Sequence, residues 1–167
     1  MGNGVFYAQD AGKTSAIAME FSAPSIAAYQ EGSQTKVEDF YHYLSLLTTP
    51  NLSPDLKTQL RENILTLFAD KKTGITNFTS DSPEKITLLQ FLETIEKRGK
   101  TTFTVIGMHS SPVSFEEYCV NTYTLQIKTA MATTTKTLHQ KIYFHPERKS
   151  FGRATKEVWS LKLGEVE

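Results

Sequence analysis

The chain has 167 residues, enough for one domain of ordinary size to bury a core without disulfides or a structural metal. Hydrophobic residues make up 39% and charged residues 22%, and 18 Lys and Arg balance 18 Asp and Glu, which excludes disorder and a global field directed at nucleic acid or membranes. The single cysteine, Cys119, rules out an internal disulfide, and no apolar run approaches the roughly 20 residues that span a bilayer, so no transmembrane segment is predicted.

The first 24 residues are rich in Gly, Ala and Ser without a sustained period, which predicts a flexible N-terminal arm. Within it, the segment from Val5 to Asp10 places an apolar stretch before a small residue and then turns polar, like the end of a bacterial signal peptide cut after Ala8. We therefore expect a periplasmic or secreted protein whose mature chain starts near Gln9. A cytoplasmic protein with an ordinary flexible terminus is the alternative, and N-terminal sequencing of protein from the source cell distinguishes the two.

The folded domain is predicted to span residues 25–167 and to open with two amphipathic helices. Apolar residues recur at helical spacing over residues 37–47 and again over 56–67. Between these stretches, Ser53 has the side chain of an N-cap and Pro54 suits the first helical position. The sequence therefore predicts a break near residue 50 and a second helix from Pro54.

A short strand and a third helix are predicted next. Residues 75–79 are β-prone and follow Gly74, which suits a left-handed helix end. Asp81 and the following serine precede Pro83, a pattern typical of a helix start, and the helix is expected to close at Gly99.

Beyond Gly99 the apolar period changes from helical to alternating, and β-branched and aromatic residues dominate. Four strands are predicted, over residues 101–109, 115–129, 137–144 and 153–163. The breaks at 110–112 and 145–150 contain proline, and the break at 130–135 is weaker. An antiparallel meander follows from this order.

This order of elements resembles the nuclear transport factor 2-like (NTF2-like) superfamily, which includes SnoaL-like proteins. The most specific segment runs from Ile75 to Leu92, ITNFTSDSPEKITLLQFL, and is similar to the family's short strand, polar turn and helix opening with an apolar pair. The resemblance covers residues 25–163. It implies an α+β fold in which three N-terminal helices pack on a curved antiparallel sheet around a cone-like cavity, and a cystatin-like arrangement of helix on sheet is the alternative.

In enzymes of the superfamily the cavity holds the substrate, so the residues expected to line it are the candidate ligand-binding residues. They are Tyr41, Phe91, Cys119, Tyr123 and Trp159. A phenol in a cavity can donate a hydrogen bond to a ligand, but each of these residues also suits a packed core.

Asp81 is the candidate catalytic residue, with Tyr41 as a hydrogen-bond donor. The resemblance places Asp81 in the turn where ketosteroid isomerase-like members carry a catalytic aspartate, although Ser82 here separates the acid from the proline. Helix capping explains the same aspartate without catalysis. The four histidines have no metal-ligand spacing, and we find no nucleophile elbow and no phosphate-binding loop, so neither a metal nor a cofactor is predicted.

Two surfaces are candidates for partners. Bases concentrate from Lys141 to Lys156, where they suit an anionic partner or simply protect a solvated sheet edge; nucleic acid is disfavoured because few aromatics interleave with the bases. The outward positions of two strands combine aromatics and threonines with few charges, which favours a homodimer through the sheet face. The predicted interface residues are Tyr118, Val120, Thr122, His139 and Tyr143.

These observations favour a non-enzymatic NTF2-like binding or assembly module that takes a small apolar ligand or a protein partner. The alternative is a cofactor-independent isomerase or dehydratase that uses Asp81 and a cavity tyrosine. The two hypotheses differ in what they require of Asp81, because only the enzyme needs it to face an open apolar cavity.

Overall fold

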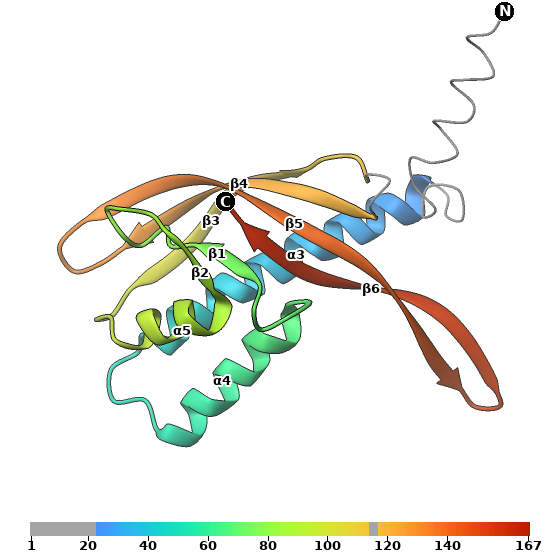
Figure 1. The fold of residues 1–167 in the computed structure, drawn as a ribbon, viewed down its shortest axis with the longest axis horizontal. Coiled ribbons are helices and arrows are strands. Elements are labelled where there is room, and N and C mark those ends of the chain that lie inside the picture. The colour runs from blue at the N-terminus through green and yellow to red at the C-terminus, as the bar shows by residue number, and fades with distance from the viewer. Residues whose placement is uncertain (1–22, 114–116) are drawn as a thin grey trace, which may run out of the picture.

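The computed structural model describes residues 23–113 and 117–167 (Figure 1). The signal-peptide junction predicted after Ala8 and nearly all of the predicted N-terminal arm lie outside the described residues, so both stay predictions. The described part is an α+β fold, with three helices and six strands of one sheet. No described helix combines the length and the hydropathy that crossing a membrane requires.

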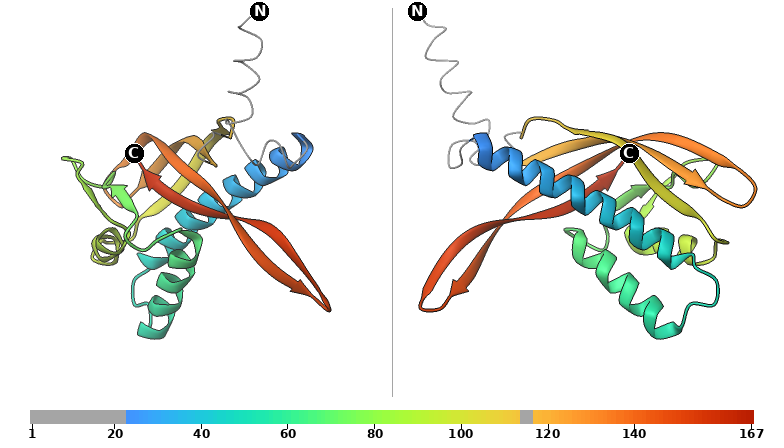
Figure 2. Two further views of the ribbon diagram at one scale, coloured as in Figure 1. Left: turned by 45° about the vertical axis from the view of Figure 1, so that its right-hand side comes forward. Right: turned by 180° about the vertical axis from the view of Figure 1, so that it is seen from behind.

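The helices are α3 (Ala23–Leu47), α4 (Pro54–Leu67) and α5 (Leu88–Glu96). The strands are β1 (Gly74–Thr76), β2 (Lys85–Thr87), β3 (Thr102–Ser110), β4 (Tyr118–Lys128), β5 (Thr133–Phe151) and β6 (Ala154–Val166). The helices lie together on one side of the sheet (Figures 1 and 2). Along β4 every second side chain from Cys119 to Ile127 is buried beneath them, as the period of a strand requires.

The sheet has the order β2-β1-β6-β5-β4-β3 and is mixed, which corrects the purely antiparallel sheet that we predicted. The end of β6 lies between β5 and the β1–β2 hairpin, and it pairs in parallel with β1 at Ile75 and Val166. The remaining neighbours are antiparallel. The parallel pair could not be predicted because it joins a three-residue strand to the last strand of the chain.

Helix α3 begins 14 residues before Val37, where we predicted the start of regular helical spacing, and it includes Pro24 of the predicted arm. Its first half carries small residues on the inner side. An added Cβ at Gly32 would lie 3.4 Å from Leu161 Cδ1, and Ser33 is fully buried and hydrogen-bonded to Asn121. Close packing on the sheet, together with Ile26 and Tyr29 against the core, thus stabilises a helical segment that lacks a continuous apolar stripe.

Helix α4 confirms the prediction, because Ser53 is its N-cap and Pro54 its first residue. Helix α5 differs from the prediction. It begins at Leu88 rather than after Pro83, and Thr87 is its N-cap, in a capping box with Gln90. Residues 85–87 instead form β2, because they pair with the strand β1 that precedes them.

Strand β5 is much longer than residues 137–144, which also corrects the prediction. It continues through Pro146 to Phe151 and turns at Gly152, whose φ of 65° suits a two-residue hairpin loop. Among the described residues, the strand beyond Phe144 pairs with β6 alone, and a proline is tolerated on such an edge because its missing N–H can face solvent. The result is a two-stranded ribbon, residues 145–160, that projects beyond the helices (Figures 1 and 2). We call it the arm.

Candidate functional site: the open face of the sheet

The place predicted for a cavity holds a packed aromatic core. Tyr41, Phe91 and Tyr123 are each at most 2% exposed. The ring centroids of Tyr41 and Tyr123 lie 5.6 Å apart, and Phe78 joins the cluster at 5.9 Å from Tyr41 and 5.1 Å from Phe91. These separations are those of packed aromatic pairs, so the structure brings three predicted ligand-binding residues together as core.

The two buried phenols form a directed hydrogen-bond chain. Tyr123 donates to Gln140 Oε1 at 3.0 Å, and the amide orientation follows from donation by Gln140 Nε2 to the carbonyl of Gly164 at 3.3 Å. The two phenol oxygens are 2.6 Å apart. Since the single proton of Tyr123 is committed to Gln140, Tyr41 is the donor between the phenols.

Burial raises the pKa of the Tyr41 phenol well above its usual range, with smaller contributions from its neighbour Tyr123. Burial likewise raises the pKa of Tyr123, against a smaller lowering by its hydrogen bond from Tyr41. Both phenols are therefore neutral near pH 7, and both protons are already donated inside the protein. Neither group is poised for acid or base catalysis.

Cys119 lies fully buried on the inner face of β4, and burial raises the pKa of its thiol to about 11. Its Sγ is 3.9 Å from Asn121 Oδ1, which also accepts from Ser110, while Asn121 Nδ2 donates to Ser33. A protonated, enclosed thiol is a poor nucleophile, so Cys119 belongs to a buried polar cluster.

Asp81 is exposed in the connection between β1 and β2 and does not cap α5, which corrects the capping interpretation. It borders a hollow of about 190 Å³ with Arg98 and Lys136, over a floor that includes Phe78. Tyr41 borders a different hollow, of about 360 Å³, between α3 and β3. The structure does not bring Asp81 and Tyr41 to one site, and the hollow beside Asp81 is below the roughly 300 Å³ of small-ligand pockets.

Trp159 lies near the middle of β6, opposite Pro146 at the root of the arm. It is half-buried and packs against the core from the arm side. It therefore lies at the margin of the core, whereas the four other ligand-binding candidates are buried inside it.

The predicted interface residues do meet on the face of the sheet turned away from the helices. The register places three cross-strand pairs side by side: Tyr118 with Tyr143, Val120 with Lys141, and Thr122 with His139. The rings of the two tyrosines are 5.9 Å apart, Lys141 Nζ lies 4.8 Å above the Tyr118 ring, and Thr122 Oγ1 is 2.9 Å from His139 Nδ1.

Strand β3 extends this open face. A bulge at Gly107 shifts the alternation, so Ile106 stands opposite Thr124 and His109 opposite Thr122. Ile106 is 46% exposed. The open face is thus a continuous surface of tyrosine, threonine, histidine and aliphatic side chains, in which Lys141 is the only formal charge among the outward residues of β4 and β5 from 118 to 126 and 135 to 143.

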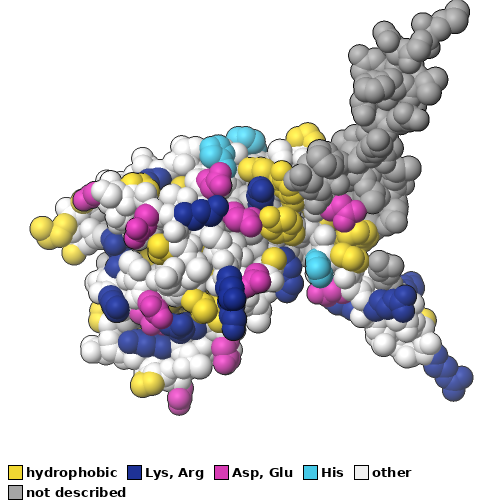
Figure 3. All heavy atoms as spheres, viewed as in Figure 1, with side chains coloured by type: hydrophobic (Ala, Val, Ile, Leu, Met, Phe, Trp, Pro, Cys, Tyr) yellow, Lys and Arg dark blue, Asp and Glu magenta, His cyan; other side chains and the backbone are white. Residues whose placement is uncertain are grey.

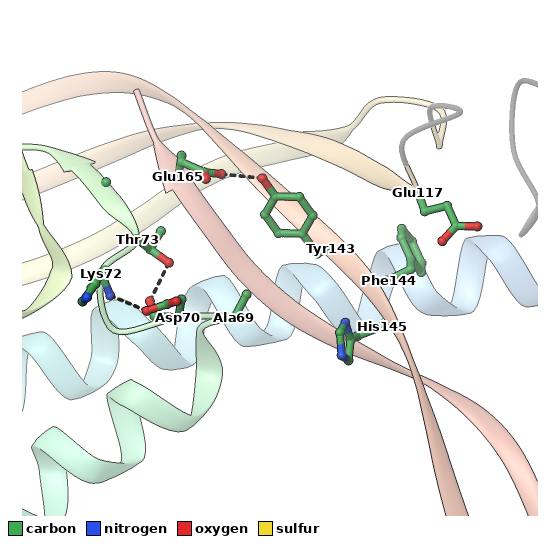
Figure 4. A pocket seen from close by; sticks show the side chains of 10 residues that line it. Ala69, Asp70, Lys72, Thr73, Glu117, Tyr143, Phe144, His145 and Glu165 are labelled. Atoms are coloured by element: carbon green, nitrogen blue, oxygen red, sulfur yellow. Dashed lines mark hydrogen bonds between the residues drawn. The ribbon is translucent and has the colours of Figure 1, made fainter.

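A groove borders this face where β5 and β6 approach the loop that follows α4 (Figure 4). Its volume is about 480 Å³. The lining residues are Ala69, Asp70, Lys72, Thr73, Gly74, Glu117, Tyr143, Phe144, His145 and Glu165. The groove is acidic because its lining includes three carboxylates, those of Asp70, Glu117 and Glu165, and one lysine, Lys72.

Tyr143 is the residue that ties the groove to the open face. Its hydroxyl donates to Glu165 Oε2 at 2.7 Å (Figure 4). Its ring lies over Gly164, where a Cβ would contact the ring directly and approach the carbonyl of Lys141 to 3.1 Å. The position of Tyr143 therefore depends on a glycine in the neighbouring strand.

Only Tyr143 of the groove was predicted from the sequence. The other lining residues come from the segment 69–74, from Glu117 immediately before β4, and from the paired strands β5 and β6. No spacing along the chain links these segments, so no local signal could have found the groove.

The arm carries the bases that we predicted for this region. Arg148, Lys149, Arg153 and Lys156 are all exposed, and Lys149 stands directly opposite Lys156. At the end of β5, Phe151 is 55% exposed. The space-filling view shows the arm as a projection with Lys and Arg side chains along it (Figure 3).

Within residues 23–113 and 117–167, no group of three His, Cys, Asp or Glu side chains could hold a metal ion. Comparisons with protein-family models, with curated proteins and with solved structures return no significant match.

Proposed function

We propose that this chain is a non-enzymatic binding and assembly module of the NTF2-like kind, which pairs with a second copy of itself through the open face of its sheet. The order of its elements and its long curved strands support the family resemblance. The partner is a protein rather than a small apolar ligand, because the inner aromatic residues are already packed against one another.

The same packing argues against the isomerase or dehydratase alternative. A general acid or base must reach the substrate by hydrogen bond, and Asp81 and Tyr41 border separate hollows. Tyr41 donates its proton to Tyr123, and Tyr123 donates its proton to Gln140.

One observation carries the proposal: the outward side chains of β4 and β5 form a nearly uncharged surface that contains two tyrosines. The inward side chains of the same strands are buried in the core. Aromatics with few charges are the composition of interface cores. An antiparallel sheet can leave one face in water, but such faces usually carry more polar and charged residues. Pairing is expected to bury at least ~1,000 Å² in total.

The test is the molecular mass in solution at micromolar concentration, measured by light scattering after size exclusion. We expect the wild type to be a dimer and Val120→Glu to be a monomer, because the substitution places a carboxylate at the centre of the open face. Leu56→Glu is the matched control. Leu56 is 47% exposed on α4, on the helical side, so the same change in charge should leave the dimer intact.

A monomeric wild type would overturn the proposed pairing. A dimer that tolerates Val120→Glu but not Leu56→Glu would move the interface to the helical side. Circular dichroism of each variant verifies that the fold is retained.

A further inference from the structure

We propose that the pairing is an exchange of arms, in which the basic arm of each copy docks in the acidic groove of the other. This inference rests on the proposed pairing of two copies and identifies the contacts that hold it. It would make the groove and the arm two halves of one self-complementary interface.

The arm has features that a free ribbon does not favour. A two-stranded ribbon alone is marginally stable in water, and like charges directly opposite each other destabilise a strand pair, as Lys149 and Lys156 are placed. Phe151 adds an exposed aromatic ring next to them. A partner that supplies carboxylates and a hollow for the ring would relieve both costs.

The groove supplies both. Asp70, Glu117 and Glu165 line it against a single lysine, Lys72. The volume of about 480 Å³ lies within the ~300–1,000 Å³ of ligand pockets, so the groove has room for an aromatic ring with a lysine stem beside it. The charges of groove and arm are therefore opposite, within a chain whose formal net charge is zero.

The position of the groove makes a two-fold exchange possible. His145 both lines the groove and begins the arm, so the groove lies at the root of the arm (Figure 4). From His145 to Phe151 the arm reaches about 20 Å at ~3.3 Å per residue. If two arms run antiparallel across a two-fold axis, the tip of each meets the root of the other, and one contact occurs twice.

The side chains also point the right way for this contact. Successive side chains of a strand alternate between faces, so Lys149 and Phe151, with Glu147 before them, share the face of Tyr143, which lines the groove. Face-to-face pairing of two open faces then brings Lys149, Lys156 and Phe151 of one arm toward the acidic groove of the partner.

Charge reversal on the two halves tests the exchange. The arm variant is Lys149→Glu with Lys156→Glu, and the groove variant is Glu117→Lys with Glu165→Lys. Each variant alone should dimerise about tenfold more weakly or worse, because like charges then meet at both copies of the contact. An equimolar mixture of the two should form a heterodimer, because each arm then meets a groove of opposite charge.

Sedimentation velocity with one variant fluorescently labelled measures both effects in full-length protein. The matched control is Lys57→Glu with Lys97→Glu, which applies the same charge change on the helical side and should dimerise like the wild type. Recovery of affinity in the mixture also shows that both variants are folded.

The outcomes separate this inference from the proposed function. If both charge variants dimerise like the wild type while Val120→Glu is monomeric, the pairing stands and the arm exchange is wrong. If the variants weaken the dimer but their mixture does not recover, the arm docks elsewhere on the partner. A monomeric wild type that binds phosphatidylglycerol vesicles or DNA through the arm would overturn both.

Discussion

A buried hydroxyl needs a partner, and the hydroxyl of Tyr123 has two. It accepts from Tyr41 and donates to Gln140. In Tyr123→Phe the proton of Tyr41 loses its acceptor and the Gln140 oxygen loses its donor, and each unsatisfied buried group costs about 1–3 kcal/mol. We expect a loss of about 2–4 kcal/mol in the free energy of unfolding, measured with urea at fixed protein concentration.

Tyr41→Phe is the control for this chain, since it removes only the first donor and leaves the bond from Tyr123 to Gln140 in place. We expect it to cost about 1 kcal/mol. Equal losses for the two substitutions would contradict the direction that we assign to the chain.

We expect the buried thiol of Cys119 to make the free energy of unfolding depend on pH in the alkaline range. Its thiol has a pKa of about 11 in the folded protein against an ordinary 9.0, so between these values the unfolded chain has released a proton that the native state retains. The unfolded state then binds fewer protons, and stability falls as pH rises through this window, after being fully present below pH 9. At 1.36 kcal/mol per pKa unit, the loss by pH 11 is about 2–3 kcal/mol.

Urea unfolding of wild type and Cys119→Ala between pH 9 and pH 10 isolates this effect, because both proteins keep the two buried tyrosines, whose contribution cancels in the comparison. The variant is less stable at every pH because it leaves a small cavity, but its stability should fall less over this interval. Parallel curves for the two proteins would show that the thiol titrates normally.

At the scale of elements, two substitutions near the start of α5 separate the role of the capping residue, Thr87, from that of Asp81 in the preceding loop. Thr87 accepts from the backbone N–H of Gln90 at 3.2 Å, and the Gln90 side chain accepts from the backbone N–H of Thr87 at 2.9 Å. Thr87→Ala should cost about 1 kcal/mol. Asp81→Ala should change stability by less than about 0.5 kcal/mol, because Asp81 is exposed and outside the helix. Thermal unfolding compares the two, and a larger loss for Asp81→Ala would restore the capping interpretation.

Elements with a strong local signal agree with the sequence. The stripe and cap of α4 and the alternation of β4 are repeated over enough residues to dominate their surroundings. The first half of α3 and the outer half of β5 do not follow local signals. Gly32 and Ser33 are helical because they pack closely on the sheet, and Pro146 is in a strand because β6 pairs with it along the arm.

At the scale of the whole molecule, the helices cover one face of the sheet (Figure 2), and Tyr143 and Glu165 line the groove beside the uncovered residues of β5 (Figure 4). The open face, the groove and the root of the arm meet at Tyr143, which faces Tyr118, bonds Glu165 and precedes the arm. A partner that covers this region would therefore contact all three. If the partner is a second copy, the unfolding temperature should also rise with protein concentration.

The sequence by itself determined the α+β class, the three helices, the inner and outer sides of β4, and the five residues that meet on the open face. These features follow from the periods of 3.6 residues in a helix and 2 residues in a strand, which are local consequences of backbone geometry. Only the tertiary structure decided that Tyr41, Phe91 and Tyr123 fill the interior, that Asp81 and Tyr41 border separate hollows, and that a groove forms at the root of the arm. These features depend on which distant segments come together, since whether two faces pack tightly or leave a hollow is set by the combined volumes of side chains from several elements.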